Sequence, residues 1–599
     1  MAYHAPVKQL RFVLDAIANL PRLYGTSAFA DVSADLVDAV LEEGGKFATG
    51  VLAPLNTVGD REGAKLANGK VTLPAGFADA YRAFVAAGWN GVAASPEFGG
   101  QGLPHTVGLA LQEMWQSANM AFGLCPILSQ GAIEALSDHG TPEQKQAYLP
   151  NLISGAWTGT MNLTEPQAGS DVGALKAKAV KQPDGSYKIT GTKIFITWGE
   201  HDAAANIIHL VLARLPDAPP GTRGISLFLV PKFLVKGDGA LGERNDLRCT
   251  GLEHKLGIHG SPTCVMSYGD DGGATGFLIG QENKGMAAMF TMMNSARLNV
   301  GMQGVAIAER SFRQALTYAR ERRQGKPFGL QHETAEMVPI VFHADVRRML
   351  LTQKALAEAG RAICLSNAMA IDEARHGETP AQRAAAKARE ELLTPISKAW
   401  CTDMGVEAAS IGVQVHGGMG FIEETGAAQH YRDARILPIY EGTNGIQAVD
   451  LIGRKLALEG GDAVRRFLNE ARETAVLCER ESELAAIGKE LTRGLKAAES
   501  ATAWLQEKMR SAATEALPGA SPYLRLMGFV TGAHFLGRGA LAAQERLKEE
   551  PRDDAFLRTR VAVAQFFAEQ LLPQAEGLLC PITRGAAGPF ALSAGELSI

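Results

Sequence analysis

Apolar residues recur at three- and four-residue spacing along the first 155 residues, which predicts a mostly helical segment. The clearest repeats cover residues 33–52 and 74–87, and Ser33 is placed to cap the first of them. Pro and Gly predict a loop over 94–103. Helices are expected over 105–124 and from Pro126 to Asp138, and Thr141-Pro142-Glu143-Gln144 has the cap, proline and acid of a helix start.

The pattern changes near Trp157 to that of short strands. Strand-like runs cover residues 176–181, 186–190, 193–197, 206–214, 224–230 and 263–268, and Pro183-Asp184-Gly185 is a hairpin turn signal. A block of about six short strands without a helical period predicts a small antiparallel barrel or sandwich rather than a parallel sheet.

Helical periodicity returns near Lys284 and holds to Leu458, with long segments over 286–305, 304–322, 339–365 and 380–401. A second helical block spans about 465–580, and its last helix should begin at Asp553-Asp554. The apolar stripe of that helix, formed by Phe556, Val563, Phe567 and Leu571, could be a dimer face, although such stripes are more often core.

The predicted fold class is therefore mainly α with a central antiparallel β domain. Five segments are expected: an N-terminal extension (1–34), an N-terminal helical domain (35–155), a middle β domain (156–282), a catalytic helical bundle (283–460) and a C-terminal helical domain (461–599). A chain of 599 residues is too long for one compact core, which agrees with several domains.

Charge and hydropathy narrow the classes of partner. The net charge of -5 and the absence of any Lys/Arg-rich run argue against nucleic acid. The longest apolar runs, such as 207–213, are of strand length, so no membrane span is expected. The first eight residues lack the apolar core of a signal peptide, and a cytoplasmic protein is predicted.

The seven cysteines lie far apart and form no C-x-x-C pair, which predicts reduced and mostly buried thiols. His254 and His259 are close together in the sequence, but no further ligand types complete a metal site around them. No metal is expected.

One carboxylate, Glu441, sits in an apolar run that continues into Gly442-Thr443-Asn444-Gly445. Aliphatic and aromatic neighbours solvate a carboxylate poorly, which disfavours its charged form and suits it to general-base work. The glycines let the backbone and its N–H groups approach a ligand. The alternative is an ordinary exposed acid before a helix that Thr443 caps and that runs to Leu458.

Other segments also have polar groups in glycine-containing loops or at strand ends. Residues 161–172 form a loop of the Thr-Glu-Pro-Gln-Ala-Gly-Ser-Asp type, which can hold an anionic ligand or be only a turn. Phe195-Ile196-Thr197 ends a strand. Arg322 can be a ligand contact or a solvated helix charge, and the glycines of 414–421 can bind a ligand or stop a helix.

Taken in order, these four motifs resemble those of the acyl-CoA dehydrogenase family over residues 35–458. The resemblance implies that the 161–172 loop and the Phe195 strand hold the flavin of FAD. It also implies that Arg322 and Gln-x-x-Gly-Gly reach the FAD of a neighbouring subunit and that Tyr-Glu-Gly-Thr supplies Glu441 as the base. The implied FAD contacts are Met161, Leu163, Thr164, Gly169, Ser170, Phe195, Ile196, Thr197, Arg322, Gln414, Gly417, Gly418, Thr443, Asn444 and Gly445. The implied substrate contacts are Ser170, Asn294, Arg297, Tyr440 and Gly442.

The implied reaction is removal of the α-proton of an acyl-CoA thioester by Glu441 with hydride transfer to FAD, giving a trans-2-enoyl-CoA. The backbone N–H of Glu441 would polarise the thioester carbonyl. The sequence is most similar to a long subgroup with an added C-terminal helical domain. That similarity implies 3-(methylthio)propanoyl-CoA or a similar short substrate, an electron-transfer flavoprotein as acceptor and a homodimer.

Alternatives remain open: a broad medium- to long-chain fatty acyl-CoA dehydrogenase, an acyl-CoA oxidase, and a non-catalytic flavoprotein with a binding or stress role. The sequence also departs from the family pattern. Gly325 stands where a Phe is usual, Met161 stands where the flavin loop often starts with an aromatic residue, and Phe195 replaces a frequent Trp.

Overall fold

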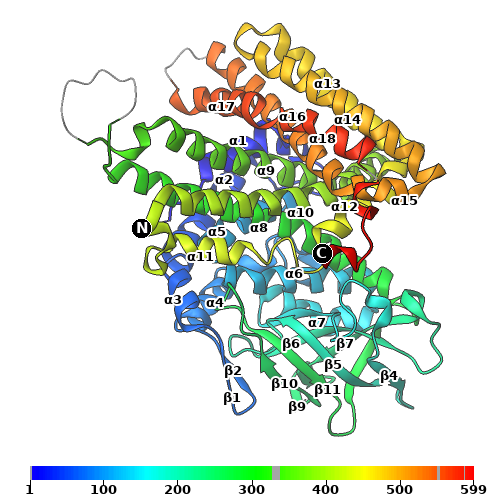
Figure 1. The fold of residues 1–599 in the computed structure, drawn as a ribbon. Helices are drawn as coiled ribbons and strands as arrows, with labels where there is room; N and C mark the ends of the chain where they lie inside the picture. The colour runs from blue at the N-terminus through cyan, green and yellow to red at the C-terminus, as the bar shows by residue number, and fades with distance from the viewer. Residues whose placement is uncertain (1–2, 327–336, 550–553, 586, 599) are drawn as a thin grey trace. The chain divides into compact units, whose positions relative to one another are not determined.

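The computed structural model describes residues 3–326, 337–549, 554–585 and 587–598 (Figure 1). The chain divides into two compact units. Of the described residues, we call 3–5 and 43–299 the barrel unit, and those within 6–42 and 300–598 the helical unit.

The barrel unit begins with helices and a small hairpin. These elements are α3 (Leu55–Glu62), β1 (Lys65–Ala67), β2 (Lys70–Thr72), α4 (Phe77–Ala86), α5 (His105–Ala118), α6 (Met120–His139) and α7 (Pro142–Ser154). The predicted capping box is present at α7, where Thr141 Oγ1 accepts from the backbone N–H of Gln144 and the Gln144 side chain accepts from the Thr141 N–H.

The helix break expected at Pro126 is wrong. The chain breaks at Asn119, whose side chain accepts from the Phe122 N–H and so caps α6, while Pro126 lies inside α6. An N-cap satisfies the open N–H groups of a helix start, which a proline further along the helix cannot do. Among the described residues, α6 is the one helix long and apolar enough to cross a membrane, and most of it is buried within the protein.

Ten strands follow: β3 (Trp157–Asn162), β4 (Lys178–Lys181), β5 (Tyr187–Thr197), β6 (Asn206–Arg214), β7 (Ile225–Pro231), β8 (Phe233–Val235), β9 (Leu241–Arg244), β10 (Leu247–Leu252), β11 (Thr263–Tyr268) and β12 (Ala274–Ile279). The main sheet has the order β10-β11-β5-β12-β7-β6-β3, and β4 pairs with both β5 and β6. The pairings β5-β12-β7-β6-β4-β5 form a closed ring, as in a small barrel.

Most strand pairs are antiparallel, as predicted, but β3 pairs with β6 in parallel over residues 157–162. The sequence pattern also divided one strand into two: the runs expected at 186–190 and 193–197 form a single strand, β5. The strands β3, β8, β9, β10 and β12 were not expected, because they are short or lack a clear alternation.

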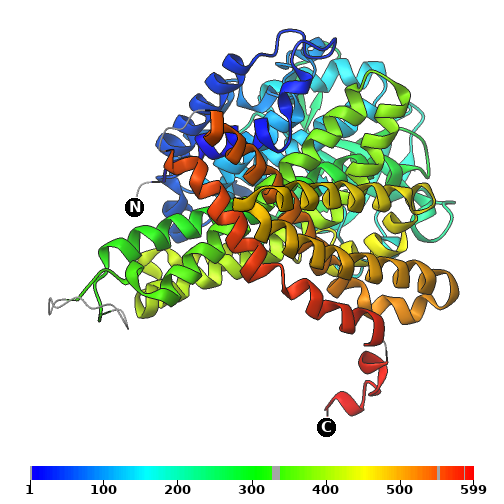
Figure 2. The same cartoon turned by 90° about the horizontal axis from the view of Figure 1, so that it is seen from above.

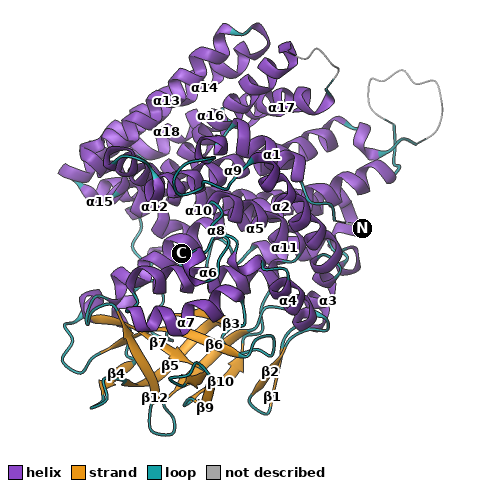
Figure 3. Ribbon diagram, turned by 180° about the vertical axis from the view of Figure 1, so that it is seen from behind, coloured by secondary structure: helices purple, strands orange, loops and turns teal. Residues whose placement is uncertain are grey.

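Successive residues of β6 and β7 face two different cores. Figure 3 shows the strands of the barrel unit in orange, with α7 lying beside them. Leu210 and Leu227 pack with α6, α7 and the start of α8 (Gly285–Glu321), whereas Val211 and Phe228 pack inside the barrel. Side chains alternate across a strand, so a strand buried on both faces reads as a continuous apolar run. This explains the nearly continuous apolar segments 207–213 and 225–230, which are interrupted by His209 and Ser226.

Two neutral histidines lie inside the barrel unit. His201 Nδ1 accepts from the backbone N–H of Ala203, which leaves Nε2–H to donate to Thr158 Oγ1 at 2.9 Å. His209 Nδ1 is 3.0 Å from the Tyr268 hydroxyl. Burial, aided by the charge of Lys232, lowers the pKa of each histidine to about 3.

We therefore expect the stability of the barrel unit to fall with acidification below neutral pH. Unfolded histidine has a pKa of about 6.5, so below this pH the unfolded chain binds protons that the folded chain refuses until about pH 3. Each histidine should cost about 2 kcal/mol at pH 5 relative to pH 7.5. Urea unfolding at several pH values measures this slope. His209→Asn should reduce it, while the matched variant of exposed His254, His254→Asn, should leave it unchanged.

The helical unit contains α1 (Val7–Ala16), the greater part of α2 (Ala34–Phe47), the C-terminal part of α8, and the remaining helices of the chain. These are α9 (Ala344–His376), α10 (Pro380–His416), α11 (Ala427–Ala434), α12 (Asn444–Gly453), α13 (Asp462–Arg480), α14 (Ala485–Ser511), α15 (Ala513–Ala516), α16 (Ala520–Glu549), α17 (Ala555–Phe566) and α18 (Gln574–Arg584). Figure 2 shows α13 and α14 running side by side.

The expected last helix is α17, and Asp554 caps it by accepting from the N–H groups of Phe556 and Leu557. Asp553 lies outside the described residues. Val563, Phe567 and Leu571 of the predicted stripe are buried within the chain, so the stripe is core rather than a dimer face. The helix after Glu441 ends at Gly453 and not at Leu458, which has an extended backbone.

Candidate active site

The loop after β3 is held by a buried ion pair between Glu165 and Lys193. Lys193 Nζ lies 2.8 Å from Glu165 Oε1 and donates to the carbonyl of Leu163 at 3.0 Å. The Glu165 carboxylate also accepts from the backbone N–H groups of Lys176 at 2.7 Å and Ala177 at 3.0 Å. Both ends of the loop are thereby fixed to one carboxylate.

Each side chain of this pair favours the charged form of the other. Burial raises the pKa of Glu165, but the ammonium of Lys193 and the hydrogen bonds outweigh burial and hold that pKa below its usual value. Burial lowers the pKa of Lys193, and Glu165 opposes that shift. Removing either partner would leave a charge in a place from which water is excluded.

The turn at the tip of the loop leaves its ligand-facing groups open. Glu165 and Ala168 exchange two backbone hydrogen bonds of 3.0 Å, which closes the turn through Pro166. Ser170 follows on the surface, and a side chain built at Gly169 would meet no atom within 4 Å. Met161 and Thr164 are partly exposed, while Leu163 is buried. The loop therefore has an open approach at Gly169-Ser170.

The end of β5 presents one aromatic ring outward. Phe195 has a left-handed backbone with φ of 60° at an irregularity in the β5-β11 register, and its side chain is 58% exposed. A non-glycine residue at positive φ is strained, and such strain collects at functional sites. Ile196 points into the barrel core, and the Thr197 carbonyl accepts from Thr160 Oγ1 at 2.7 Å. Contacts of Ile196 with a cofactor would therefore be made by its backbone.

Two predicted substrate contacts lie on the first part of α8, in the barrel unit. Arg297 Nη1 donates to Asn294 Oδ1 at 3.3 Å, and the guanidinium lies over the Phe290 ring. Arg297 is buried rather than a surface charge.

The segment around Glu441 lies in the helical unit and is a loop closed by its own backbone. The Asn444 N–H donates to the Pro438 carbonyl at 3.1 Å, so Tyr440, Glu441 and Gly442 are at the turn. Gly442 has φ of 68°, a conformation that favours glycine. Glu441 is partly exposed, so its apolar neighbours in the sequence do not by themselves remove it from water.

Two neighbours of Glu441 are committed to other bonds. The Tyr440 hydroxyl donates to Gln303 Oε1, and burial raises the pKa of Tyr440, so this phenol stays protonated and is no competing base. The Asn444 side chain bonds to Lys398 at 2.8 Å and to Asp403 at 2.7 Å, both on α10. Asn444 therefore anchors the loop to α10 through its side chain and closes the loop through its backbone N–H.

The last group of predicted residues lies at one end of the helical unit. The rings of Tyr318 on α8 and His416 on α10 stack with centroids 4.5 Å apart, which brings together the ends of these two helices. Arg322 and Gln414, at these ends, are exposed, and Arg322 has no ion-pair partner in the described part of the chain. Gly417 and Gly418 would each accept a Cβ without any contact within 4 Å.

The sequence did not indicate Lys193 and Glu165 as the residues that hold the 161–172 loop, or Gln447 in the helix that follows Glu441. A lysine two residues before Phe195, on the inward face of a strand, was a usable signal for Lys193. Gln447, in the first turn of α12, is fully buried, and neither polar atom of its amide has a hydrogen-bond partner among the described residues. No sequence pattern distinguishes such a glutamine from an exposed one.

The chain belongs to the acyl-CoA dehydrogenase family. The matching family models describe an acyl-CoA dehydrogenase N-terminal domain at residues 41–156, a middle domain at 160–271, a C-terminal domain at 283–457 and an acetyl-CoA dehydrogenase C-terminal-like region at 463–593. The chain is 49% identical over 579 residues, or 96% of each chain, to 3-methylmercaptopropionyl-CoA dehydrogenase of Ruegeria pomeroyi.

A more distant relative also matches over nearly its whole length. A broad-specificity linear acyl-CoA dehydrogenase of Mycobacterium tuberculosis is 36% identical over 95% of this chain and 96% of its own. The fold matches that of a solved acyl-CoA dehydrogenase from Bacillus anthracis with a TM-score of 0.72, at 20% identity, over 100% of this chain and 94% of that one. The family, the fold class and the assignment as an oxidoreductase are thus confirmed.

Proposed function

We propose that this protein catalyses FAD-dependent α,β-dehydrogenation of an acyl-CoA thioester, and that its substrate is 3-(methylthio)propanoyl-CoA or a similar short acyl-CoA. The observation that carries the reaction is Glu441 in a closed turn beside a tyrosine that is already committed as a hydrogen-bond donor. The substrate rests on 49% identity over nearly the whole length of a relative that is named for it.

The residues present fit FAD. Phe195 offers an exposed ring. Space for a ligand to approach the backbone is left at Gly169, Gly417, Gly418 and Gly445. Leu163, Thr164, Ser170 and Thr197 would hold the flavin end, and Arg322 with Gln414 would hold the pyrophosphate end in a neighbouring subunit. FAD, when bound, supplies the acceptor for the β-hydrogen as hydride.

The residues of the chain perform the remaining steps. The Glu441 carboxylate takes the α-proton of the thioester, and its backbone N–H donates to the thioester oxygen as negative charge develops there. Tyr440 keeps its proton and fixes the turn through Gln303. Asn294, Arg297 and Ser170 would contact the CoA portion. The buried pair Glu165–Lys193 keeps the flavin loop in place.

A series of acyl-CoAs tests the substrate. We expect kcat/KM, measured with an artificial electron acceptor, to be highest for 3-(methylthio)propanoyl-CoA and for acyl chains of about four to six carbons. Each methylene of the acyl chain that fits the substrate pocket should add up to about 0.8 kcal/mol of favourable burial. Each methylene that does not fit should cost at least as much through overpacking. An optimum at twelve to sixteen carbons would replace this assignment with the broad fatty acyl-CoA dehydrogenase.

The acceptor is tested in the same assay. We propose an electron-transfer flavoprotein as the acceptor and the cytoplasm as the site of action. Stoichiometric hydrogen peroxide without an added acceptor would instead identify an acyl-CoA oxidase. A flavin that no acyl-CoA bleaches would favour the non-catalytic flavoprotein.

We also propose a homodimer. Met419, Phe421 and Ile422, beside Gln414-Gly418, are exposed apolar residues, and Phe421 is 86% exposed. An apolar patch next to residues that would reach a neighbouring subunit's FAD supports an interface there. Light scattering at micromolar concentration should give the mass of a dimer. A stable tetramer would contradict the idea that the C-terminal helices cover the second interface, and a monomer with full FAD would contradict the shared site.

We retain the five segments 1–34, 35–155, 156–282, 283–460 and 461–599 as the proposed domain division. The bounds of the four matching family models, which start at residues 41, 160, 283 and 463, support it.

A further inference from the structure

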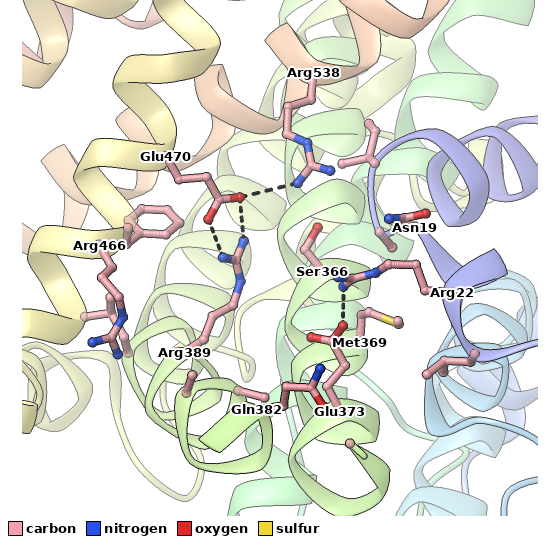
Figure 4. A pocket seen from close by; sticks show the side chains of 18 of the residues that line it. Asn19, Arg22, Ser366, Met369, Glu373, Gln382, Arg389, Arg466, Glu470 and Arg538 are labelled. Atoms are coloured by element: carbon pink, nitrogen blue, oxygen red, sulfur yellow. Dashed lines mark hydrogen bonds and ion pairs between the residues drawn. The ribbon is translucent and has the colours of Figure 1, made fainter. Parts of the chain in front are cut away.

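A cavity of about 950 Å³ lies within the helical unit (Figure 4). It is bordered by the short helix Leu20–Leu23 and by α9, α10, α13 and α16. None of the residues assigned above to FAD, acyl-CoA or the base lines it. The cavity is therefore a second candidate site, and nothing in the proposed reaction requires it.

The charged groups in its wall are unevenly paired. Arg389 makes two bonds to Glu470, of 2.5 and 3.2 Å. Arg538 reaches the same carboxylate only with Nη1 at 3.5 Å, and His534 Nε2 lies at the same distance from it. One carboxylate thus serves two guanidinium groups and a buried histidine, and most of the five donors of Arg538 have no partner among the described residues.

Arg22 and Glu373 form a separate ion pair, which lies to the right of Glu470 and Arg389 in Figure 4. Arg22 and Arg389 both lower the pKa of Arg538, after the larger effect of burial and against the influence of Glu470. The three guanidinium groups are thus within electrostatic reach of one another, and an added anion between them would relieve their repulsion.

A second observation points into the same cavity. Ser366, on α9, lines it, is only 5% exposed, and its hydroxyl has no hydrogen-bond partner in the described residues. A buried hydroxyl without a partner costs free energy, and a bound ligand would remove that cost. In the view of Figure 4, Ser366 is seen between the Arg389–Glu470 pair and the Arg22–Glu373 pair.

The rest of the wall limits the kind of ligand. Leu23, Met369 and Leu541 supply apolar surface. Glu378 and Glu473 also line the cavity, and their charges disfavour a polyanion. The wall therefore suits one anionic group attached to a short apolar part.

We propose that this cavity binds a small organic anion, with a single carboxylate or phosphate group held by Arg538 and Arg389 and a short apolar part against the aliphatic wall. Guanidinium groups bind both kinds of group through paired N–H donors. Ser366 would supply a further hydrogen bond. This proposal is independent of the proposed acyl-CoA reaction.

Calorimetric titration of the full-length flavoprotein tests the proposal, with hexanoate and inorganic phosphate as separate probes at constant ionic strength. We expect saturable binding of at least one probe. Hexanoate alone would show that the site takes a carboxylate with an apolar part, and phosphate alone would contradict the apolar part of the proposal. Arg538→Met should weaken binding about tenfold or more. The matched control is Arg465→Met on α13, because Arg465 pairs with Asp462 and does not line the cavity.

Arg538→Met also removes a contact to Glu470, so a second variant separates binding from folding. Ala385→Phe places a ring in the cavity from α10 without changing any charge, and it should abolish binding while flavin content and the unfolding temperature stay near those of the wild type. Binding that survives in Ala385→Phe, binding lost equally in Arg465→Met, or no saturable binding to the wild type would overturn the proposal.

Discussion

Glu441→Gln should retain FAD and the native fold but lose reduction of the flavin by acyl-CoA. The amide has nearly the shape of the carboxylate, yet it cannot accept the α-proton. Tyr440 cannot take over, because its hydroxyl is a donor to Gln303. We expect the rate of flavin bleaching under anaerobic conditions to fall at least about 10³-fold, within the range for loss of a general base.

Glu424→Gln is the matched control for this experiment. Glu424 is an exposed glutamate in the short helix Glu423–Thr425, in the same unit, and its replacement should leave the bleaching rate unchanged. Equal rates of flavin reduction in Glu441→Gln and the wild type would show that the base lies elsewhere. If Glu441→Gln also lost FAD, a disturbed fold rather than lost proton transfer would explain the loss of flavin reduction.

Lys193→Met, on β5, should be the most destabilising single change among the residues that hold the 161–172 loop. It leaves the Glu165 carboxylate buried without its cation, and loss of one partner of a buried pair costs about 3–5 kcal/mol. The carbonyl of Leu163 also loses its donor. We expect the free energy of unfolding in urea to fall by this amount, and the flavin-to-protein absorbance ratio after gel filtration to drop.

Two further variants test whether the uncompensated charge of Glu165 causes this loss of stability. Lys181→Met, on neighbouring β4, removes an exposed pair with Glu282 at 3.5 Å, in which the side chains are 64% and 43% exposed, and should leave the free energy of unfolding nearly unchanged because water screens the pair. The double variant Lys193→Met/Glu165→Gln removes the buried charge but keeps one acceptor oxygen for the backbone N–H groups of Lys176 and Ala177, which bond to the two different oxygens of Glu165, and should regain part of the lost stability. If it is as unstable as Lys193→Met, an uncompensated charge is not the cause.

Elements whose signals are local could be predicted from the amino-acid sequence alone. The capping box at Thr141, the cap at Asp554 and the nearly continuous apolar runs of β6 and β7 depend on a few adjacent residues, so their positions could be predicted. The motifs around Ser170, Phe195, Arg322 and Glu441 follow one another in a fixed order, and this order indicated the family before any coordinates.

Features that depend on residues far apart in the chain became clear from the three-dimensional arrangement alone. Pairing of β3 with β6 joins residues about fifty positions apart, and Asn119, at the break between α5 and α6, donates to the carbonyl of Leu52 at 3.5 Å. Asn444 anchors its loop through Lys398 and Asp403 on α10, and Lys193 meets Glu165 across two elements. The second cavity arises where Arg538, Glu470, Arg389 and Ser366 come together from four helices. Hydropathy and spacing register neighbours along the chain, whereas burial, ion pairing and cavities are set by neighbours in space.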